Sequence, residues 1–317
     1  MKVTEHIRQA KDTLFSIEIL PPLKGHDIKS LFRAIEPLME FKPSFIDVTY
    51  HREEFIYKSG PNGLLEKVAT RKRPGTVAIC AAIMNRFQVD AVPHIICGGF
   101  DKEETENALI DLHFLGIDNV LALRGDAVKA EGKFIPHPHG NAYATDLICQ
   151  IQDLNKGKYL HDYVANGTPT NFSIGIAGYP EKHFDAPTLQ ADMDYLKKKI
   201  DLGSDYVVTQ MFFDNQKYFD YVKKCKEMGI DAPIIPGLKP ITTIKQITLL
   251  PSVFYIDLPE ALLKELLKCK EDKEVAEVGI EWCIQQSKEL RAGGAPVLHY
   301  YTMSKSESIK RIAAGVF

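Results

Sequence analysis

The feature that most constrains the fold is a regular alternation of short apolar runs with longer amphipathic segments. The strand-like runs cover residues 14–20, 45–50, 92–97, 120–124, 172–177, 206–210, 234–237 and 297–301. Segments with one apolar face at helical spacing lie between them, at residues 26–41, 76–87, 103–115 and 188–201. Eight parallel strands separated by helices in 317 residues favour a closed barrel over an open doubly wound sheet. The sequence therefore predicts an α/β fold, a (β/α)8 TIM barrel with parallel strands, as a single domain over residues 1–317.

The charge balance and the cysteine pattern exclude several classes of protein. The 39 Lys and Arg nearly balance the 42 Asp and Glu, and no segment is both basic and aromatic, as a nucleic-acid site would be. The six cysteines lack the two-residue spacing of a zinc site or a redox pair. No apolar run reaches the ~18 residues of a membrane span, and the N-terminus lacks the pattern of a signal peptide. We therefore expect a cytoplasmic protein with no nucleic-acid or membrane partner.

Two of the predicted strands run into a carboxylate. Glu18 lies in the apolar run 14–20, and Asp126 follows the run 120–124. A carboxylate among apolar residues loses hydration, so it is retained where it is paired or used. For Glu18 the structural alternative is a salt bridge to a distant Lys or Arg. We interpret both carboxylates as active-site candidates.

Other polar side chains fall near the ends of predicted strands, where a parallel barrel places its active site. Seven strands contribute to this set: Glu18, Thr49, Tyr50, His94, Arg124, Asp126, Tyr179, Gln210 and Tyr301. For His94 taken alone, a hydrogen-bonded core histidine is as good an interpretation as a ligand contact. The irregular loop 127–141 would overhang the same face as a lid.

Three further patterns carry little weight alone. Lys197, Lys198 and Lys199 could meet a phosphate, but on an amphipathic helix such lysines are usually solvated. His137 and His139 have no carboxylate or thiol at ligand spacing, so we predict no metal site. Neither Gly-x-Gly-x-x-Gly nor Gly-x-x-x-x-Gly-Lys occurs, so a nucleotide cofactor would need a different cradle.

Taken together, these residues give the chain a strong family resemblance. It resembles the methylenetetrahydrofolate reductases, flavoenzymes that make 5-methyltetrahydrofolate, and specifically their short bacterial-type catalytic barrel. The matching motifs include Phe15-Ser16-Ile17-Glu18, Val48-Thr49-Tyr50, Pro93-His94, Leu123-Arg124-Gly125-Asp126, Gly178-Tyr179-Pro180-Glu181, Thr209-Gln210 and His299-Tyr300-Tyr301. The resemblance covers nearly the whole chain. It implies reduction of 5,10-methylenetetrahydrofolate with a nicotinamide as electron donor, in one-carbon metabolism and methionine biosynthesis.

The resemblance also implies FAD as cofactor and a role for each matching residue. The implied FAD-binding residues are Thr49, Tyr50, His94, Arg124, Gly125, Asp126, Tyr143, Tyr179, His183, Asp192, Lys198 and Lys199. The two lysines would then face the pyrophosphate, which reverses their interpretation as solvated. The implied folate-binding residues are Gln210, Gln246, Tyr301 and Lys305.

The same resemblance gives the two carboxylates different tasks. Glu18, with its pKa raised by desolvation, would be the general acid that opens the folate's imidazolidine ring. Asp126 would be an ionised carboxylate that stabilises the cationic iminium formed by that opening.

Some positions depart from the family pattern. His51 stands where Gly is usual, and Met211 where an aromatic residue is common. Leu250 replaces a Phe that stacks on nicotinamide in some members, so NADH, NADPH and a protein carrier all stay open as donors. Ser304 and Lys305 replace Asn and Arg, which loses bidentate pairing with a glutamate carboxylate.

The chain has no extension after Phe317, so we expect no C-terminal regulatory domain. A homo-oligomer is left open. Two other classes also stay open: a flavin-free pterin-binding barrel of the corrinoid-linked methyltransferase type, and a flavin or folate binding protein without catalysis.

Overall fold

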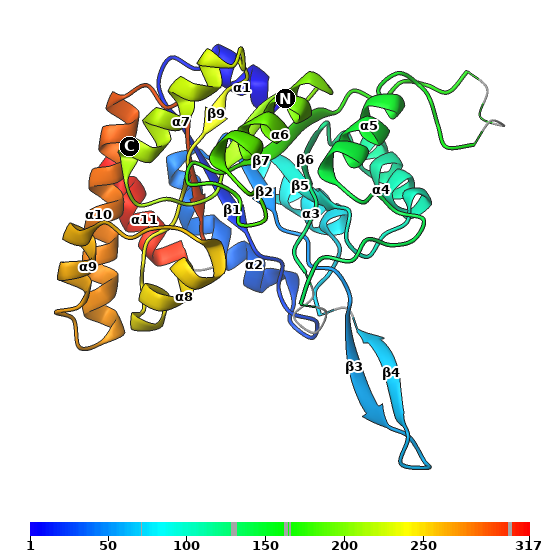
Figure 1. Cartoon of the computed structure of the whole chain (residues 1–317), viewed down its shortest axis with the longest axis horizontal. Helices are drawn as coiled ribbons and strands as arrows, with labels where there is room; N and C mark the ends of the chain where they lie inside the picture. The colour runs from blue at the N-terminus through cyan, green and yellow to red at the C-terminus, as the bar shows by residue number, and fades with distance from the viewer. Residues whose placement is uncertain (71, 128–131, 162–163, 165, 304–305) are drawn as a thin grey trace.

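The computed structural model of the chain describes residues 1–70, 72–127, 132–161, 164, 166–303 and 306–317. Its centre is a sheet of nine parallel strands with helices packed around it (Figure 1). The strands are β1 Leu14–Ile19, β2 Phe45–Val48, β5 Asp90–Ile96, β6 Asn119–Leu123, β7 Ser173–Gly178, β8 Tyr206–Thr209, β9 Ile234–Ile235, β10 Gly237–Leu238 and β11 Val297–Tyr301. Their order in the sheet is β10-β11-β1-β2-β5-β6-β7-β8-β9.

The barrel is completed by a strand that bends at Pro236. β9 pairs with β8, β10 pairs with β11, and only Pro236 separates β9 from β10 in the chain. Proline has no N–H for a sheet ladder, but the Pro236 carbonyl accepts a hydrogen bond from the His299 N–H at 3.1 Å. Counting β9 and β10 as one bent strand gives eight, so the predicted (β/α)8 barrel is confirmed. The strand predicted at 234–237 spans 234–238 in the structure and is interrupted at Pro236.

The helices confirm three of the predicted segments and divide the fourth. They are α1 Val3–Gln9, α2 Ile28–Ile35, α3 Thr76–Phe87, α4 Lys102–Phe114, α5 Ala144–Leu154, α6 Leu189–Asp201, α7 Asn215–Glu227, α8 Ile244–Phe254, α9 Glu260–Leu266, α10 Asp272–Ala292 and α11 Ser306–Val316. The segment predicted at 26–41 becomes α2 followed by the 3-10 helix η1 Glu36–Phe41. Pro37 cannot donate the next helical hydrogen bond, so the α-helix ends there. Within the described part of the chain, no helix is long and apolar enough to cross a membrane.

Apolar side chains close the barrel at the amino ends of its strands. This inner cluster comprises Val3, Phe45, Val92, Leu121, Tyr206, Val208, Ile235 and Val297. Val3 belongs to α1 and is fully buried, so the N-terminal helix packs against the barrel floor. A larger apolar cluster lies between the strands and the surrounding helices. With the floor filled, a ligand has access to the interior from the carboxyl ends of the strands.

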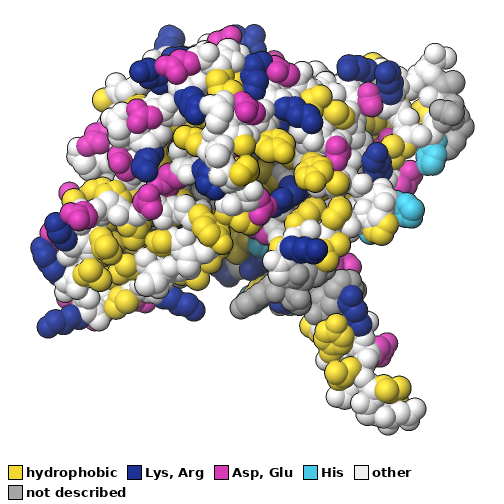
Figure 2. All heavy atoms as spheres, in the orientation of Figure 1, with side chains coloured by type: hydrophobic (Ala, Val, Ile, Leu, Met, Phe, Trp, Pro, Cys, Tyr) yellow, Lys and Arg dark blue, Asp and Glu magenta, His cyan; other side chains and the backbone are white. Residues whose placement is uncertain are grey.

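The predicted strands do not include an antiparallel hairpin of β3 Glu54–Ser59 and β4 Leu65–Thr70. It projects well away from the barrel, as Figures 1 and 2 show. The turn Gly60-Pro61-Asn62-Gly63 is typical of a hairpin, and Gly63 adopts a positive φ of 71°. Tyr57 and Leu65 are about two-thirds exposed, so these two side chains bury little apolar surface.

Gly279→Ala should destabilise the fold, although alanine is about 1 kcal/mol better than glycine inside a helix. Gly279 lies in α10, and a Cβ there would come within 1.9 Å of the Ile241 carbonyl oxygen. That atom belongs to the backbone and cannot rotate away, so we expect an overpacking cost of about 1–3 kcal/mol. Thermal denaturation measures the effect. Gly315→Ala in α11 is the control, because its Cβ would meet only the Ile284 side chain, at 3.2 Å. Equal melting temperatures for the two variants would contradict the prediction.

Candidate active site

A large pocket opens at the carboxyl ends of the barrel strands, with a volume of about 2550 Å³. All eight strand positions contribute to its lining. Among the described residues, every predicted site residue lines it: Glu18, Thr49, Tyr50, His94, Arg124, Gly125, Asp126, Tyr143, Tyr179, His183, Asp192, Lys198, Lys199, Gln210, Gln246 and Tyr301. Lys305 and its neighbour Ser304 lie outside the described residues. The sequence positions that were grouped as a site therefore share one cavity, while their individual roles stay predictions.

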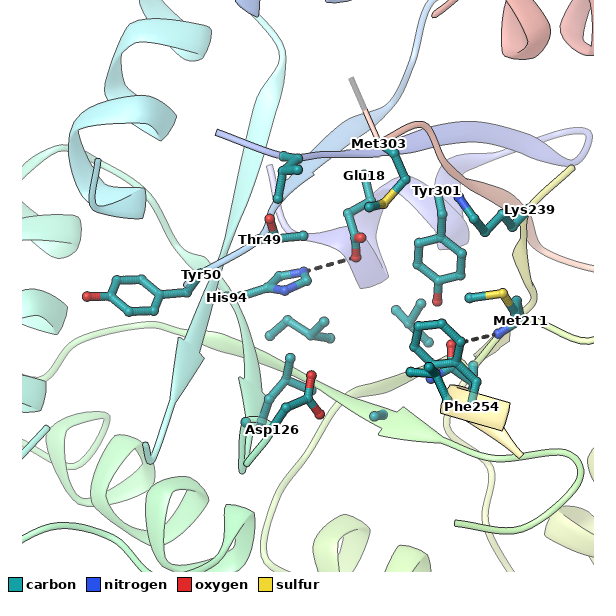
Figure 3. A pocket seen from close by; sticks show the side chains of 18 of the residues that line it. Glu18, Thr49, Tyr50, His94, Asp126, Met211, Lys239, Phe254, Tyr301 and Met303 are labelled. Atoms are coloured by element: carbon teal, nitrogen blue, oxygen red, sulfur yellow. Dashed lines mark hydrogen bonds and ion pairs between the residues drawn. The ribbon is translucent and has the colours of Figure 1, made fainter. Parts of the chain in front are cut away.

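Glu18 points into the pocket beside His94, as Figure 3 shows. The Glu18 Oε2 atom lies 3.5 Å from His94 Nε2, and the Glu18 side chain is 14% exposed. Burial raises the pKa of Glu18 to about 7; His94 and Lys239 oppose this shift, and the Asp47 charge adds to it. Burial also lowers the pKa of His94, so His94 is a weak counter-charge near neutral pH. Glu18 is therefore suited to hold a proton at neutral pH.

Asp47 is a site residue that the sequence reasoning missed. It lies in β2, level with Glu18 of β1, and is completely buried. Its Oδ2 atom is 3.5 Å from His94 Nε2, and burial raises its pKa to about 7, opposed by His299. The signal was available, because Asp47 stands within the apolar run 45–50 just as Glu18 stands within 14–20. Both carboxylates lie among apolar residues that deprive them of hydration.

Cationic side chains gather on the wall formed after β6 and by α6. Arg124 pairs with Asp185 at 2.7 Å and lies over the Phe134 ring, 5.1 Å from its centroid. Lys199 is not solvated: its Nζ donates a hydrogen bond to the Ala177 carbonyl at 2.8 Å, and burial lowers its pKa to about 8. Its neighbour Lys198 lines the same pocket. This wall is suited to an anionic ligand group.

The loop after β7 is held against α6 beside this wall. The His183 N–H donates to Asp192 Oδ2 at 2.9 Å, and the rings of Tyr179 and His183 meet edge to face at 4.7 Å. Burial lowers the pKa of His183, with Arg124 acting in the same direction. The neutral ring and Tyr179 thus offer hydrogen-bonding and stacking surface rather than charge.

The opposite wall comes from β8, β11 and α8. The Gln210 carboxamide oxygen accepts from the Met211 N–H at 3.1 Å, and the Tyr301 hydroxyl donates to the Thr209 carbonyl at 2.6 Å. Gln246 caps α8, with its side-chain oxygen accepting from the Thr242 N–H at 2.7 Å. That oxygen is thus already engaged, which leaves the Gln246 NH2 group for a ligand.

Leu250 and Phe254 of α8 line the pocket to different extents. Leu250 lines it but is only 3% exposed and belongs to a core cluster with Met211. Phe254, one helical turn later, also lines the pocket and is labelled in Figure 3. The predicted lid 127–141 lies partly outside the described residues, at 128–131, so the lid stays a prediction.

Comparison with known proteins gives consistent matches along the chain. A family model described as methylenetetrahydrofolate reductase matches residues 2–316. Methylenetetrahydrofolate reductase (NADH) 1 of Arabidopsis thaliana is 32% identical, over 97% of this chain and 49% of the relative. The probable methylenetetrahydrofolate reductase (NADPH) of Caenorhabditis elegans is also 32% identical, over 97% of this chain and 43% of the relative. The chain therefore spans about half the length of these relatives.

A bacterial relative and a solved structure cover more of their own length. The 5,10-methylenetetrahydrofolate reductase of Escherichia coli K12 is 29% identical, over 92% of this chain and 86% of the relative. The structure is an uncharacterized protein from Clostridium thermocellum that binds two copies of 5-methyl-5,6,7,8-tetrahydrofolic acid. It has a TM-score of 0.58 and 14% identity, over 99% of this chain and 98% of that one. At this identity the structural match supports the fold alone.

Glu18→Gln should change how stability depends on pH. The folded protein keeps a proton on Glu18 up to about pH 7, whereas the unfolded chain releases it near the ordinary value of 4.5. Between these values the folded state binds more protons, so stability falls as pH rises. Gln carries no such penalty, and the shift corresponds to about 3 kcal/mol. Urea denaturation should therefore show the variant more stable than the parent at pH 8, with little difference at pH 4.

The control for this measurement is Glu260→Gln, at an exposed position of α9. We expect its effect on stability to be small at both pH values. A stability difference for Glu18→Gln that is the same at pH 4 and pH 8 would contradict the raised pKa.

Proposed function

Since the chain belongs to the methylenetetrahydrofolate reductase family, we propose that it reduces 5,10-methylenetetrahydrofolate to 5-methyltetrahydrofolate with bound FAD. This oxidoreductase reaction would serve one-carbon metabolism and methionine biosynthesis. The observation that carries the proposal is Glu18, a carboxyl group kept protonated near neutral pH, facing a pocket with a cationic wall. Reductive opening of the folate ring needs such an acid.

The residues present fit FAD. The pocket volume of about 2550 Å³ exceeds the roughly 300–1,000 Å³ of common small-ligand sites, as a dinucleotide with a second ligand requires. Thr49 Oγ1 is buried and has no hydrogen-bond partner among the described residues, so it is available to a ligand. We propose that Arg124, Lys198 and Lys199 pair with the pyrophosphate. Gly125, with a φ of 85°, lets the backbone turn close to Ile96 at the pocket edge.

FAD, when bound, supplies the hydride that the folate receives. The chain's own residues prepare the folate for it. Glu18 donates its proton to the folate nitrogen that leaves as the imidazolidine ring opens, which produces a cationic iminium on the other nitrogen. The Asp126 carboxylate, on the same pocket, stabilises that positive charge. Gln210 and Gln246 on the opposite wall, with Tyr301, are the proposed contacts to the pterin and the tail.

A nicotinamide is the donor that we propose, as the names of the relatives indicate for those proteins. Leu250 gives no ring for stacking, whereas Phe254 offers one on the same helix face, four residues later. The six free cysteine thiols support our proposal of a reducing cytoplasm. We also propose that residues 1–317 form one catalytic domain.

The two other classes are separated by simple observations. A flavin-free pterin barrel has no use for the cationic wall around Arg124, and its purified protein would lack the yellow absorbance of FAD. A binding protein without catalysis has no use for an acid at Glu18. An absorption spectrum followed by anaerobic titration with NADH and NADPH tests both alternatives and the choice of donor.

Glu18→Gln should separate the two halves of the reaction. We expect the nicotinamide to reduce bound FAD at nearly the parental rate, because that step needs no acid. Transfer to the folate should slow by ~100-fold to 10,000-fold, the usual cost of removing a general acid. Anaerobic stopped-flow absorbance of each half-reaction measures this, with Glu260→Gln as control. A parental rate of folate reduction in Glu18→Gln would rule out the assigned role.

Asp126→Asn should raise the midpoint potential of bound FAD. Removing a negative charge from the pocket makes uptake of electrons more favourable. The folate step should slow as well, because the iminium loses its counter-charge. Spectroelectrochemical titration gives the potential. Asp194→Asn, an equal charge change at an exposed position of α6, should leave it unchanged. An equal or lower potential in Asp126→Asn would count against this placement of the carboxylate.

A further inference from the structure

A polar layer lies inside the barrel at the level of Glu18 and just below it. It contains Ser16, Asp47, His94 and His299, none of them more than 5% exposed. The apolar floor of the barrel closes it on the other side. Polar groups buried this deeply are costly unless they are paired, so their arrangement calls for a functional explanation.

One atom, His94 Nε2, connects the two carboxyl groups of this region. It lies 3.5 Å from Glu18 Oε2 and 3.5 Å from Asp47 Oδ2. Among the described residues, neither this nitrogen nor either Asp47 oxygen has a hydrogen-bond partner within normal distance. A ring nitrogen holds a single proton, so Nε2 can serve either carboxyl group but only one at a time.

The groups around the two carboxyls come from several elements: Cys80 of α3, His94 of β5, Tyr206 of β8, Lys239 after β10, and His299 and Tyr301 of β11. Burial lowers the pKa of both histidines and raises the pKa of Cys80 and of both tyrosines, so all five are neutral near pH 7. His299 Nδ1 is engaged with Ser16 Oγ at 2.8 Å. Asp47 and Glu18 are the two acids in this set that titrate near neutrality.

We propose that Asp47 is a proton reserve for Glu18, with His94 Nε2 as the atom that passes the proton between them. The proposal deepens the proposed function and rests on it. Asp47 does not line the pocket surface and acts through His94, so it is a positioning residue rather than a catalytic one.

The transfer moves one proton and no electrons. After Glu18 has protonated the folate, the O–H bond of Asp47 breaks and its proton bonds to Nε2 of neutral His94, whose other proton is on Nδ1. The new N–H bond then breaks as the proton forms an O–H bond on Glu18. Asp47 is left as a carboxylate. It regains its proton by the reverse route when Glu18 takes one from water in the open pocket.

Glu18 has limited access to protons from water while the pocket is occupied. Glu18 is mostly buried, and a bound folate and cofactor would cover what is left of its exposed surface. A proton stored within reach of the same imidazole lets Glu18 be recharged while the ligands are in place. Within the described ranges, no group of three or more His, Cys, Asp or Glu side chains is placed to hold a metal ion.

Asp47→Asn tests the proposal through the pH dependence of steady-state folate reduction, in which Glu18 must regain its proton in every cycle. Near pH 6 Glu18 is protonated in both proteins, so we expect similar rates. Removing the neighbouring acid and its negative charge should lower the pH at which the rate is half-maximal on the alkaline side by about one unit. Above that pH the rate should fall about tenfold relative to the parent. Reduction of bound FAD by the nicotinamide should be unchanged.

The matched control is Tyr206→Phe, which removes a buried hydroxyl from the same interior without changing any group that titrates near neutrality. A purely structural role of Asp47 would lower stability or scale the rate equally at every pH, as the control would. An alkaline limb for Asp47→Asn that coincides with the parental limb overturns the reserve and leaves the proposed function intact.

Infrared difference spectroscopy of the protein between pH 6 and pH 9 gives a readout that needs no turnover. The proposal requires a protonated carboxylic acid band at neutral pH that disappears in Asp47→Asn and a second that disappears in Glu18→Gln. Absence of the Asp47 band at neutral pH overturns the reserve. Failure of the parent to reduce the folate at any pH instead overturns the proposed function, and the bands tell the two failures apart.

Discussion

Desolvation of carboxyl groups inside the barrel is the constraint on which the rest of the site depends. The floor packed around Val3 and Phe45 keeps water out from below, so Glu18 and Asp47 meet solvent poorly or not at all. Their negative charge is therefore penalised, and the proton stays bound at pH values where an exposed carboxyl has lost it. The same apolar packing that stabilises the barrel thus keeps a proton on carboxyl groups near neutral pH, where a general acid has to hold one.

Strand register turns this constraint into a precise arrangement. Glu18 lies level with Asp47 on one side and with Tyr301 on the other, so three adjacent strands present polar groups at one height. The bend at Pro236 brings β10 beside β11 and completes the ring around them. The mostly buried acids Glu18 and Asp47 lie in the interior, and the cations Arg124 and Lys199 line the pocket nearer its rim, where an anionic ligand can reach them.

Much of the fold and site followed from local patterns, whereas features that depend on strand pairing did not. Apolar runs identify strands, and polar residues at their ends identify the rim, so the barrel and its pocket were predictable. Asp47 was overlooked although it stands in an apolar run, as Glu18 does. Its closeness to Glu18 and His94, and the place of His299 below them, depend on the register of neighbouring strands, which local patterns do not show. The break at Pro236 depends in the same way on pairing partners. The hairpin was missed for a different reason. Its turn residues are visible in the sequence, but its strands lack the apolar run by which a core strand is identified.

The β3–β4 hairpin can be altered with little effect on the barrel strands. Its two ends, Glu54 and Thr70, are paired with each other, so the chain leaves and re-enters the barrel at nearly the same point. Because its ends are held together by pairing, the hairpin can change length with little effect on the entropy of the strands that carry Glu18 and Asp47. The turn around Pro61 and Asn62 is therefore a natural attachment point for a fluorophore or an affinity tag. A label there would lie at the tip of the hairpin, away from the residues that line the pocket.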